Sequence, residues 1–186
     1  GEVLSQAEDF GKNKVLAGKK VMVEYTDPNP FKEFHIGHLM SNSVGESISR
    51  IVQFQGAEVR RACYQGDVGL HVAKAIWSTI SHDNNEDISH VWDQLVRGQA
   101  YAKGNKAYEE DEKAKKEIIE INKKIYDRSD EHINSRYDEG RKKSLEYFEL
   151  IYTKLGTRFD NYFFESETGE FGKKIVEEFL SHGIFE

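Results

Sequence analysis

Two histidines enclose a glycine in the stretch His35-Ile36-Gly37-His38, and these are residue types that can act on phosphate. An imidazole can donate hydrogen bonds to phosphate oxygens as negative charge develops in a transition state. The glycine leaves room for a phosphate or a flat base to approach the backbone. His35 and His38 are therefore candidate catalytic residues, and Gly37 is a candidate nucleotide contact.

The surrounding sequence places this pair between a strand and a helix. An apolar run predicts a buried strand over roughly 19–26, and the only two prolines follow it in Asp27-Pro28-Asn29-Pro30. After His38 the apolar residues take helical spacing as far as Gly56, a good residue to end a helix. The histidines then lie at a helix N-terminus, where unpaired backbone N–H groups and the helix dipole favour phosphate.

Two plainer interpretations of the histidines stay open from the residues alone. Surface polar residues are common near helix caps, and most H-x-x-H pairs carry no function. Zinc, with His71 and Cys63 as extra ligands, is disfavoured because the spacing does not repeat as in a zinc site. We expect no metal site formed by the protein side chains.

A second strand is predicted at 59–64, followed by Gly66-Asp67-Val68-Gly69. Strand, crossover helix and second strand form a βαβ unit with parallel pairing. Ligands bind beyond the carboxyl ends of the strands in such sheets. Asn29 and Asp67 both follow these ends, so Asp67 is a candidate pocket residue.

Helical spacing dominates the chain from about 72 to 155. The segments 72–80 and 88–96 are each consistent with a helix, and the polar run at 83–87 separates them. The clearest helical pattern covers 104–129, where apolar residues repeat at intervals of 4, 3 and 4. We also predict a long helix over 133–155, a third strand over 158–164 and a last helix over 171–180.

Length and composition bound the class of protein. The 186 residues suffice for one domain, and charged residues make up 32% of them. No apolar run near 18 residues and no secretory signal is found, and the single cysteine fits a reducing compartment, so we expect a cytoplasmic protein without a membrane span. The net charge of −7 argues against broad electrostatic binding of nucleic acid. Residues 1–18 are expected to be a linker or short helix.

Three motifs in order resemble the arginyl-tRNA synthetases, a class I aminoacyl-tRNA synthetase family. The family pattern V-E-[FY]-S-S-P-N-x-x-K-P-F-H-x-G-H-L-R-S is similar to the segment from Val23 to Ser41. Gly66-Asp67-Val68-Gly69 is similar to the family's G-D-W-G. The segment from Gly156 to Ser166 is similar to its G-x-x-[FY]-D-x-Y-x-x-E-S. The resemblance extends from about residue 18 to the end and is weakest over 72–135.

The resemblance implies an α/β fold, namely the first half of a Rossmann-like parallel-sheet catalytic domain over 19–186 with a helical insertion at about 72–155. It implies activation of arginine by ATP, with Mg²⁺ accompanying the ATP, followed by transfer of arginine to tRNA(Arg). Lys32, His35, Gly37 and His38 would bind ATP. Glu24 and Asn29 would bind arginine. From the residues alone, Glu24 could equally face solvent, Asn29 could be a turn residue and Lys32 a solvated lysine.

The chain departs from the family pattern at several positions. Met40, Glu33 and Val68 stand where the family usually has arginine, proline and tryptophan, and the residues after Gly69 also differ. The second half of the fold and the anticodon-binding module are missing. We therefore expect this piece to be inactive alone, to bind tRNA weakly and to self-associate through an open sheet edge.

Two other functions compete with this interpretation. An H-x-G-H nucleotidyltransferase shares the half-fold, although it has no need for the Glu24 and Asn29 pair. A non-catalytic paralogue of the synthetases could bind a nucleotide or a partner protein.

Overall fold

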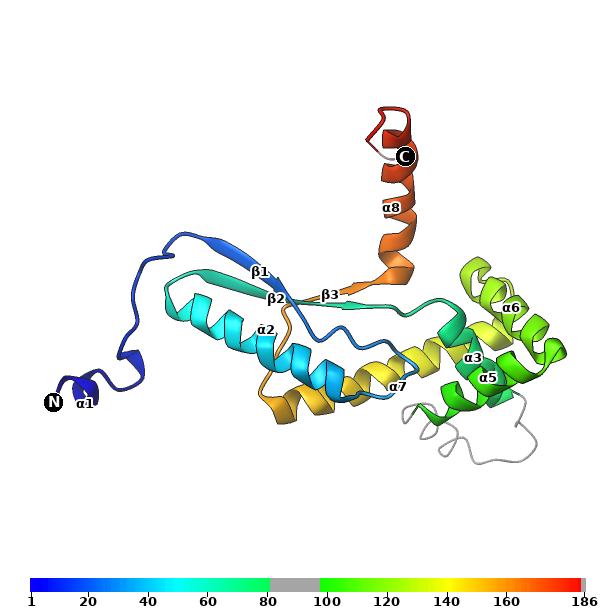
Figure 1. Ribbon diagram of the computed structural model, residues 1–186, viewed down its shortest axis with the longest axis horizontal. Helices are drawn as coiled ribbons and strands as arrows, with labels where there is room; N and C mark the ends of the chain where they lie inside the picture. The colour runs from blue at the N-terminus through cyan, green and yellow to red at the C-terminus, as the bar shows by residue number, and fades with distance from the viewer. Residues whose placement is uncertain (81–97, 185–186) are drawn as a thin grey trace.

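The computed structural model describes residues 1–80 and 98–184 (Figure 1). A three-stranded sheet joins an N-terminal arm (residues 1–19), a helical block at the far end and a last helix that projects away from the strands. The elements in chain order are α1 (Glu2–Gln6), the 3₁₀ helix η1 (Ala7–Asp9), β1 (Lys20–Glu24), α2 (Ile36–Phe54), β2 (Glu58–Gln65), α3 (Leu70–Ile80), α5 (Gln99–Glu110), α6 (Glu112–Asp127), α7 (Glu131–Leu155), β3 (Asn161–Phe164) and α8 (Glu165–Leu180).

The three strands are parallel and lie in the order β1-β2-β3, which confirms the predicted βαβ unit. Glu24 pairs with Ala62, and Gln65 pairs with Phe164. The carboxyl ends of all three strands therefore lie along the same edge of the sheet. One edge of β1 has no neighbouring strand among the described residues.

The side of helix α2 that packs against the sheet is mostly polar. Its buried residues are Asn42, Gly45, Glu46 and Ser49. Glu46 accepts hydrogen bonds from the Tyr25 hydroxyl at 2.5 Å and from Arg61 Nε at 3.0 Å. The apolar side faces solvent instead, with Ile36 77% and Met40 70% exposed, and it also includes Val44, Ile48 and Ile51.

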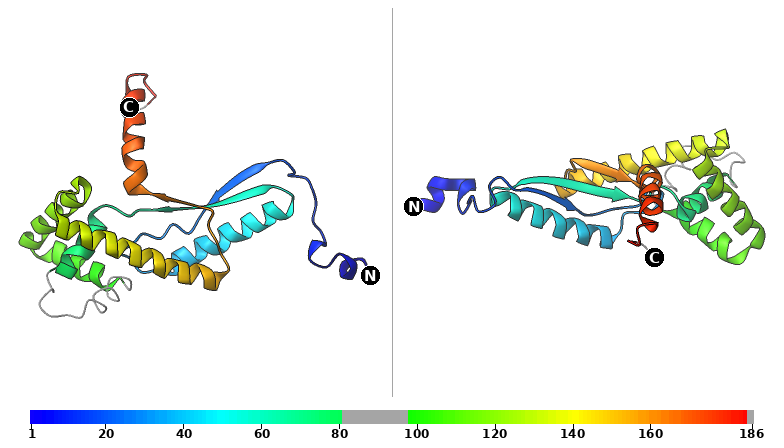
Figure 2. Two further views of the ribbon diagram at one scale, coloured as in Figure 1. Left: turned by 180° about the vertical axis from the view of Figure 1, so that it is seen from behind. Right: turned by 90° about the horizontal axis from the view of Figure 1, so that it is seen from above.

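A second set of buried side chains joins α7 to the sheet. Tyr152 and Phe159 meet edge-to-face with ring centroids 5.0 Å apart, and Phe159 also lies 4.9 Å from Tyr25. Cys63 and Phe148 complete this cluster. Figures 1 and 2 show α2 and α7 on the same side of the strands, so the sheet is supported by two helices there.

The helical block between β2 and β3 has its own core, formed by α3, α5, α6 and the first half of α7. The predicted apolar repeat is confirmed, since Ala114, Ile118, Ile121 and Ile125 are all buried. The prediction of one helix over 104–129 is wrong, because α5 ends at Glu110 and Asp111 caps α6. The Asp111 carboxylate accepts a hydrogen bond from the Lys113 N–H at 2.8 Å, which favours a new helix start over continuation.

The remaining predictions differ mainly at their boundaries. Helix α3 confirms the helix expected over 72–80, whereas the predictions for 83–87 and 88–96 lie outside the described residues. The long helix predicted at 133–155 is α7. The last helix starts at Glu165 rather than 171, directly after β3. Within the described residues, no helix is both long and apolar enough to cross a membrane.

Candidate functional site

His35 and His38 cap helix α2 reciprocally. Gly37 N–H donates to His35 Nδ1 at 3.1 Å, and His35 N–H donates to His38 Nδ1 at 3.2 Å. Each Nδ1 is thus an acceptor, so each neutral ring carries its proton on Nε2. A side chain at position 37 would crowd the His35 ring, because its Cβ would lie 3.0 Å from Cε1. The arrangement leaves two Nε2–H groups as donors at the helix N-terminus.

Burial lowers the pKa of His38 to about 4, and the neighbouring His35 and Lys32 add to this shift. The Phe34 ring lies 5.2 Å from the His38 ring and contributes to the apolar surroundings. His38 is therefore neutral at physiological pH, which keeps its hydrogen bond to the His35 N–H and its Nε2–H donor.

The loop between β1 and α2 is held in an unfavourable backbone conformation. Thr26, Asp27 and Phe31 have positive φ values of 79°, 48° and 67°. Hydrogen bonds fix it at both ends: Tyr64 N–H donates to Asp27 at 2.7 Å, and Phe31 N–H donates to the Ser144 hydroxyl at 3.0 Å. Such residues persist where surrounding contacts hold them, and they concentrate at functional sites.

Asn29 joins this loop to the end of β2. Its side-chain oxygen accepts a hydrogen bond from the Gly66 N–H at 3.1 Å. A Cβ at position 66 would lie 2.7 Å from that oxygen and 3.1 Å from Glu165 Oε2, so Gly66 permits the close approach of both side chains. The Asn29 amide nitrogen is then the part of this side chain left to donate to a ligand.

Glu24 lies exposed at the carboxyl end of β1 and shares a cavity with Gly37, whereas His35, His38, Asn29 and Lys32 are not among the residues that line it. The cavity measures about 430 Å³ and is lined by residues of β1 and α2. Its lining includes Glu24, Tyr25, Gly37, Met40 and Ser41. Burial raises the pKa of the nearby Asp27, and the Glu24 charge adds to that rise. The negative charges of Glu24 and Asp27 therefore repel one another at the start of the loop between β1 and α2.

Lys32 is partly buried between the loop and the helical block. Its ammonium lies 4.9 Å from the centroid of the Tyr101 ring on α5. Burial lowers the pKa of Lys32, and the charge of Lys74 adds to this effect. Lys74, on α3, is a cation near the site that sequence reasoning missed. Its only sequence signal is its place one turn after His71 on a helix that follows a strand end.

Asp67 is fully buried and is bonded on both oxygens. It accepts hydrogen bonds from Arg141 Nε at 2.7 Å, the Tyr137 hydroxyl at 3.2 Å, and the N–H and hydroxyl of Ser166 at 2.9 and 2.7 Å. Asp67 thus connects the end of β2 to α7 and α8. Phe164, under the Arg141 guanidinium at 3.9 Å, completes this junction.

Cys63 and His71, the two extra residues considered as zinc ligands, are each engaged in other contacts. Burial raises the pKa of Cys63 to about 12, which opposes the thiolate that zinc requires. His71 Nε2 lies 2.9 Å from the Gly66 carbonyl oxygen. No group of three or more His, Cys, Asp or Glu residues within 1–80 and 98–184 is arranged to hold a metal ion.

Comparison with known proteins identifies relatives of the chain. It is 30% identical to an arginine–tRNA ligase of Treponema pallidum and 32% identical to one of Borrelia garinii, and each match covers 98% of this chain. The chain spans about 31% of the length of these curated relatives.

Solved structures share the fold. The arginyl-tRNA synthetase of Thermus thermophilus matches with a TM-score of 0.69 at 22% identity, over 94% of this chain and 28% of that chain. A putative arginyl-tRNA synthetase of Campylobacter jejuni matches with a TM-score of 0.62 at 22% identity, over 100% of this chain and 39% of that chain. The Rossmann-like sheet expected from the sequence is thus confirmed. The family model for class I tRNA synthetases (R), catalytic domain, matches residues 1–185, and the chain belongs to this family.

Proposed function

We propose that this chain is the ATP- and arginine-binding part of an arginine–tRNA ligase that acts within a longer polypeptide. The observation that carries the proposal is the cavity of about 430 Å³ that joins Glu24, at the end of β1, to Gly37 between the two capping histidines. The Glu24 carboxylate and the first turn of α2, which we propose binds phosphate, share one space there. A cationic amino acid and ATP need these two features side by side.

The acidic end of the cavity suits a guanidinium group. Glu24 is exposed there, and Asp27 lies close enough for their charges to interact. A guanidinium pairs with a carboxylate through two parallel hydrogen bonds. The Asn29 amide nitrogen, oriented by the bond from Gly66 to its oxygen, would donate to the amino-acid carboxylate. Glu24 and Asn29 are thus the proposed arginine-binding residues.

The N-terminus of α2, beside the cavity, suits the phosphates of ATP, although among the proposed ATP-binding residues only Gly37 lines the cavity itself. His35 and His38 would donate through Nε2, Gly37 would allow close approach, and Lys32 would supply a positive charge. In the proposed step the arginine carboxylate attacks the α-phosphorus of ATP and forms a carboxyl–phosphate bond. The bond from the α-phosphorus to the oxygen that bridges to the β-phosphate breaks, and pyrophosphate leaves with its electron pair. The residues act by positioning and by stabilising negative charge.

Magnesium would enter with ATP and neutralise charge on its phosphates. The described residues offer no cluster of three metal-binding side chains for it, so the ATP oxygens and water would supply most of its ligands.

Asp67 has a supporting role in this proposal. Its oxygens are occupied by Arg141, Tyr137 and Ser166, so we assign it to positioning of the Gly66 segment rather than to ligand contact. Residues 1–18 remain a proposed linker, and 19–186 a proposed partial catalytic domain with its helical insertion at about 72–155.

We further propose that the chain alone is inactive and binds tRNA(Arg) weakly. We expect the isolated chain to self-associate through the open edge of β1. The free, buried Cys63 fits the proposed cytoplasmic location.

Pyrophosphate exchange by the full-length polypeptide tests this function, with tRNA present and each amino acid supplied in turn. Exchange that depends on arginine alone is the expected result. Exchange that proceeds in the absence of any amino acid would favour the nucleotidyltransferase alternative. Exchange that depends on another amino acid would overturn the arginine assignment.

A further inference from the structure

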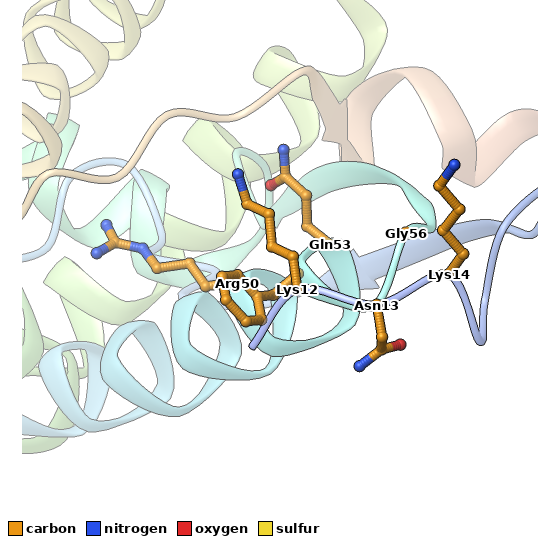
Figure 3. A pocket seen from close by; sticks show the side chains of 7 residues that line it. Lys12, Asn13, Lys14, Arg50, Gln53 and Gly56 are labelled. Carbon is orange, nitrogen blue, oxygen red and sulfur yellow. The ribbon is translucent and has the colours of Figure 1, made fainter. Parts of the chain in front are cut away.

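A basic cavity lies at the opposite end of α2 from the histidine pair. It measures about 540 Å³ and is bounded by the N-terminal arm and the last turns of α2 (Figure 3). Its lining consists of Lys12, Asn13, Lys14, Arg50, Gln53, Phe54 and Gly56. Three of these carry a positive charge and none is acidic, in a chain whose net charge is −7.

The arm is fixed in place by backbone contacts. Asn13 N–H donates to the Phe54 carbonyl at 3.5 Å, and Leu16 N–H donates to the Gln55 carbonyl at 2.9 Å. Gly56 allows the arm to pass close by, since a Cβ there would lie 3.2 Å from the Asn13 carbonyl oxygen. The carbonyl groups at the end of α2 are thereby covered, which weakens the repulsion that a helix C-terminus exerts on an anion.

Both lysines of the cavity extend to one side of the arm. In Figure 3, Lys12, Lys14 and Gln53 extend to the same side, while Asn13 points the opposite way. The Asn13 side-chain oxygen accepts a hydrogen bond from Val15 N–H at 3.1 Å, which holds this turn. The ammonium of Lys12 lies 5.9 Å from the centroid of the Phe54 ring, so an aromatic face and a cation are neighbours.

Two of the cations already have acidic partners. Lys12 pairs with Asp9, whose side chain is 73% exposed, and Arg50 pairs with Glu46 at 2.7 Å. An exposed ion pair such as Lys12–Asp9 contributes little to stability, so Lys12 can exchange its aspartate partner for a phosphate at low cost. Lys14 has no acidic partner within the described residues.

We propose that this cavity binds the backbone of an RNA strand, with one base stacked on Phe54 and the flanking phosphates on Lys12 and Lys14. Aromatic rings that alternate with cations are the usual means of binding single-stranded nucleic acid. This inference rests on the proposed function, in which the substrate is an RNA. It gives that RNA a contact remote from the site of chemistry.

The length of α2 favours an RNA strand over a free nucleotide bound at the histidines. Its residues Ile36–Phe54 span roughly 28 Å at about 1.5 Å per residue. An ATP molecule at His35 and His38 cannot reach the cavity, whereas a folded RNA can contact both ends of the helix. A separate free nucleotide would satisfy the same chemistry, and the experiment must distinguish the two.

Fluorescence anisotropy with the 186-residue chain tests the proposal. The probe is a fluorescein-labelled 15-nucleotide RNA of mixed sequence, titrated at several salt concentrations without ATP or arginine. We expect weak binding, which Lys12→Gln/Lys14→Gln reduces about tenfold at low salt while lowering the salt slope by about 1.4. Phe54→Leu should reduce binding about fivefold with the slope unchanged.

A matched control removes two lysines elsewhere. Lys173 and Lys174 on α8 are likewise exposed, and each forms an ion pair with a glutamate of the same helix, so Lys173→Gln/Lys174→Gln should change binding less than twofold. Circular dichroism melts check that all variants fold. Equal losses in both double variants, an unchanged affinity in Lys12→Gln/Lys14→Gln, or displacement of the RNA by AMP at equal nucleotide concentration would overturn the proposal.

The outcome is separable from the test of the proposed function. RNA binding is measured without arginine activation, so loss of the cavity contact leaves the histidine site untouched. Failure of arginine-dependent exchange in the longer polypeptide, with RNA binding intact, would overturn the proposed function and leave the RNA contact standing.

Discussion

The imidazole rings of His35 and His38 stack nearly parallel, with centroids 3.8 Å apart and an angle of 16° between their planes. The stacking brings both Nε2–H donors to the same helix end. It also ties the proposed chemistry to the folding of α2, because the same rings accept hydrogen bonds from backbone N–H groups at the start of that helix.

Removal of the His38 ring should impair arginine activation. In the full-length polypeptide, His38→Ala is expected to lower the rate of exchange by about 10²–10³-fold, since a donor to the developing charge is lost. The reciprocal cap is lost too, at about 1 kcal/mol of stability. Steady-state exchange assays measure the rate, with Ile36→Ala, an exposed neighbour in the same turn, as control. A rate within threefold of the parent protein would contradict the role of His38.

Stability of the chain should fall as the pH drops from about 6.5 to about 4. The pKa of His38 is lowered to about 4 in the folded chain, so in this window the unfolded state takes up the proton first. Protonation also removes the Nδ1 acceptor for His35 N–H. Urea denaturation at pH 7, 6, 5 and 4 measures the loss.

The control for this pH effect is His38→Gln, which can still bond back to the cap without titrating. Its stability should fall less over the same window than that of the parent chain. Identical pH profiles for the two proteins would show that another group is responsible.

Arg141→Met should destabilise the chain by about 3 kcal/mol, because Asp67 would remain buried without its cation. Arg60→Met is the matched control, since Arg60 pairs with Glu58 at the surface and exposed pairs contribute less than about 1 kcal/mol. Urea denaturation of both variants gives the difference. Equal losses would mean that the Asp67 junction contributes no more than a surface ion pair.

Gly104→Ala should disrupt the contact between α3 and α5. Its Cβ would lie 1.9 Å from the Lys74 carbonyl oxygen, a backbone atom that cannot rotate away. We expect a loss of at least about 2 kcal/mol from the strain of overpacking. Gly169→Ala in α8 meets nothing within 4 Å and should be neutral or slightly stabilising. Thermal melts compare the two, and a stable Gly104→Ala chain would require a looser packing of α3 on α5.

The strands and the parallel pairing of the first two could be predicted from local patterns, because an apolar run between turn residues is a short-range signal. The break between α5 and α6 at Asp111 could not be predicted. The apolar repeat begins only at Ala114, and in the sequence a capping aspartate looks like any exposed aspartate. The inverted packing of α2 was equally hidden. Its buried side is polar because Asn42 bonds to Thr26 and Thr157, and Glu46 to Tyr25, all distant in sequence.

The site shows the same division. His35, Gly37 and His38 could be selected by type and spacing, whereas Glu24 could be selected only through the family resemblance. The structure brings Gly37 and Glu24 to one cavity. The capping role of the Nδ1 atoms, the burial of Asp67 and the approach of Lys74 depend on tertiary contacts. No local pattern carries those contacts.

The most direct measurement is the KM for arginine in the exchange assay of the full-length polypeptide carrying Glu24→Gln. We expect an increase of at least about tenfold for arginine, with the KM for ATP unchanged, because only the carboxylate proposed to bind the guanidinium is removed. An unchanged KM for arginine, or an equal rise for ATP, would contradict the shared cavity as the place where the two substrates meet.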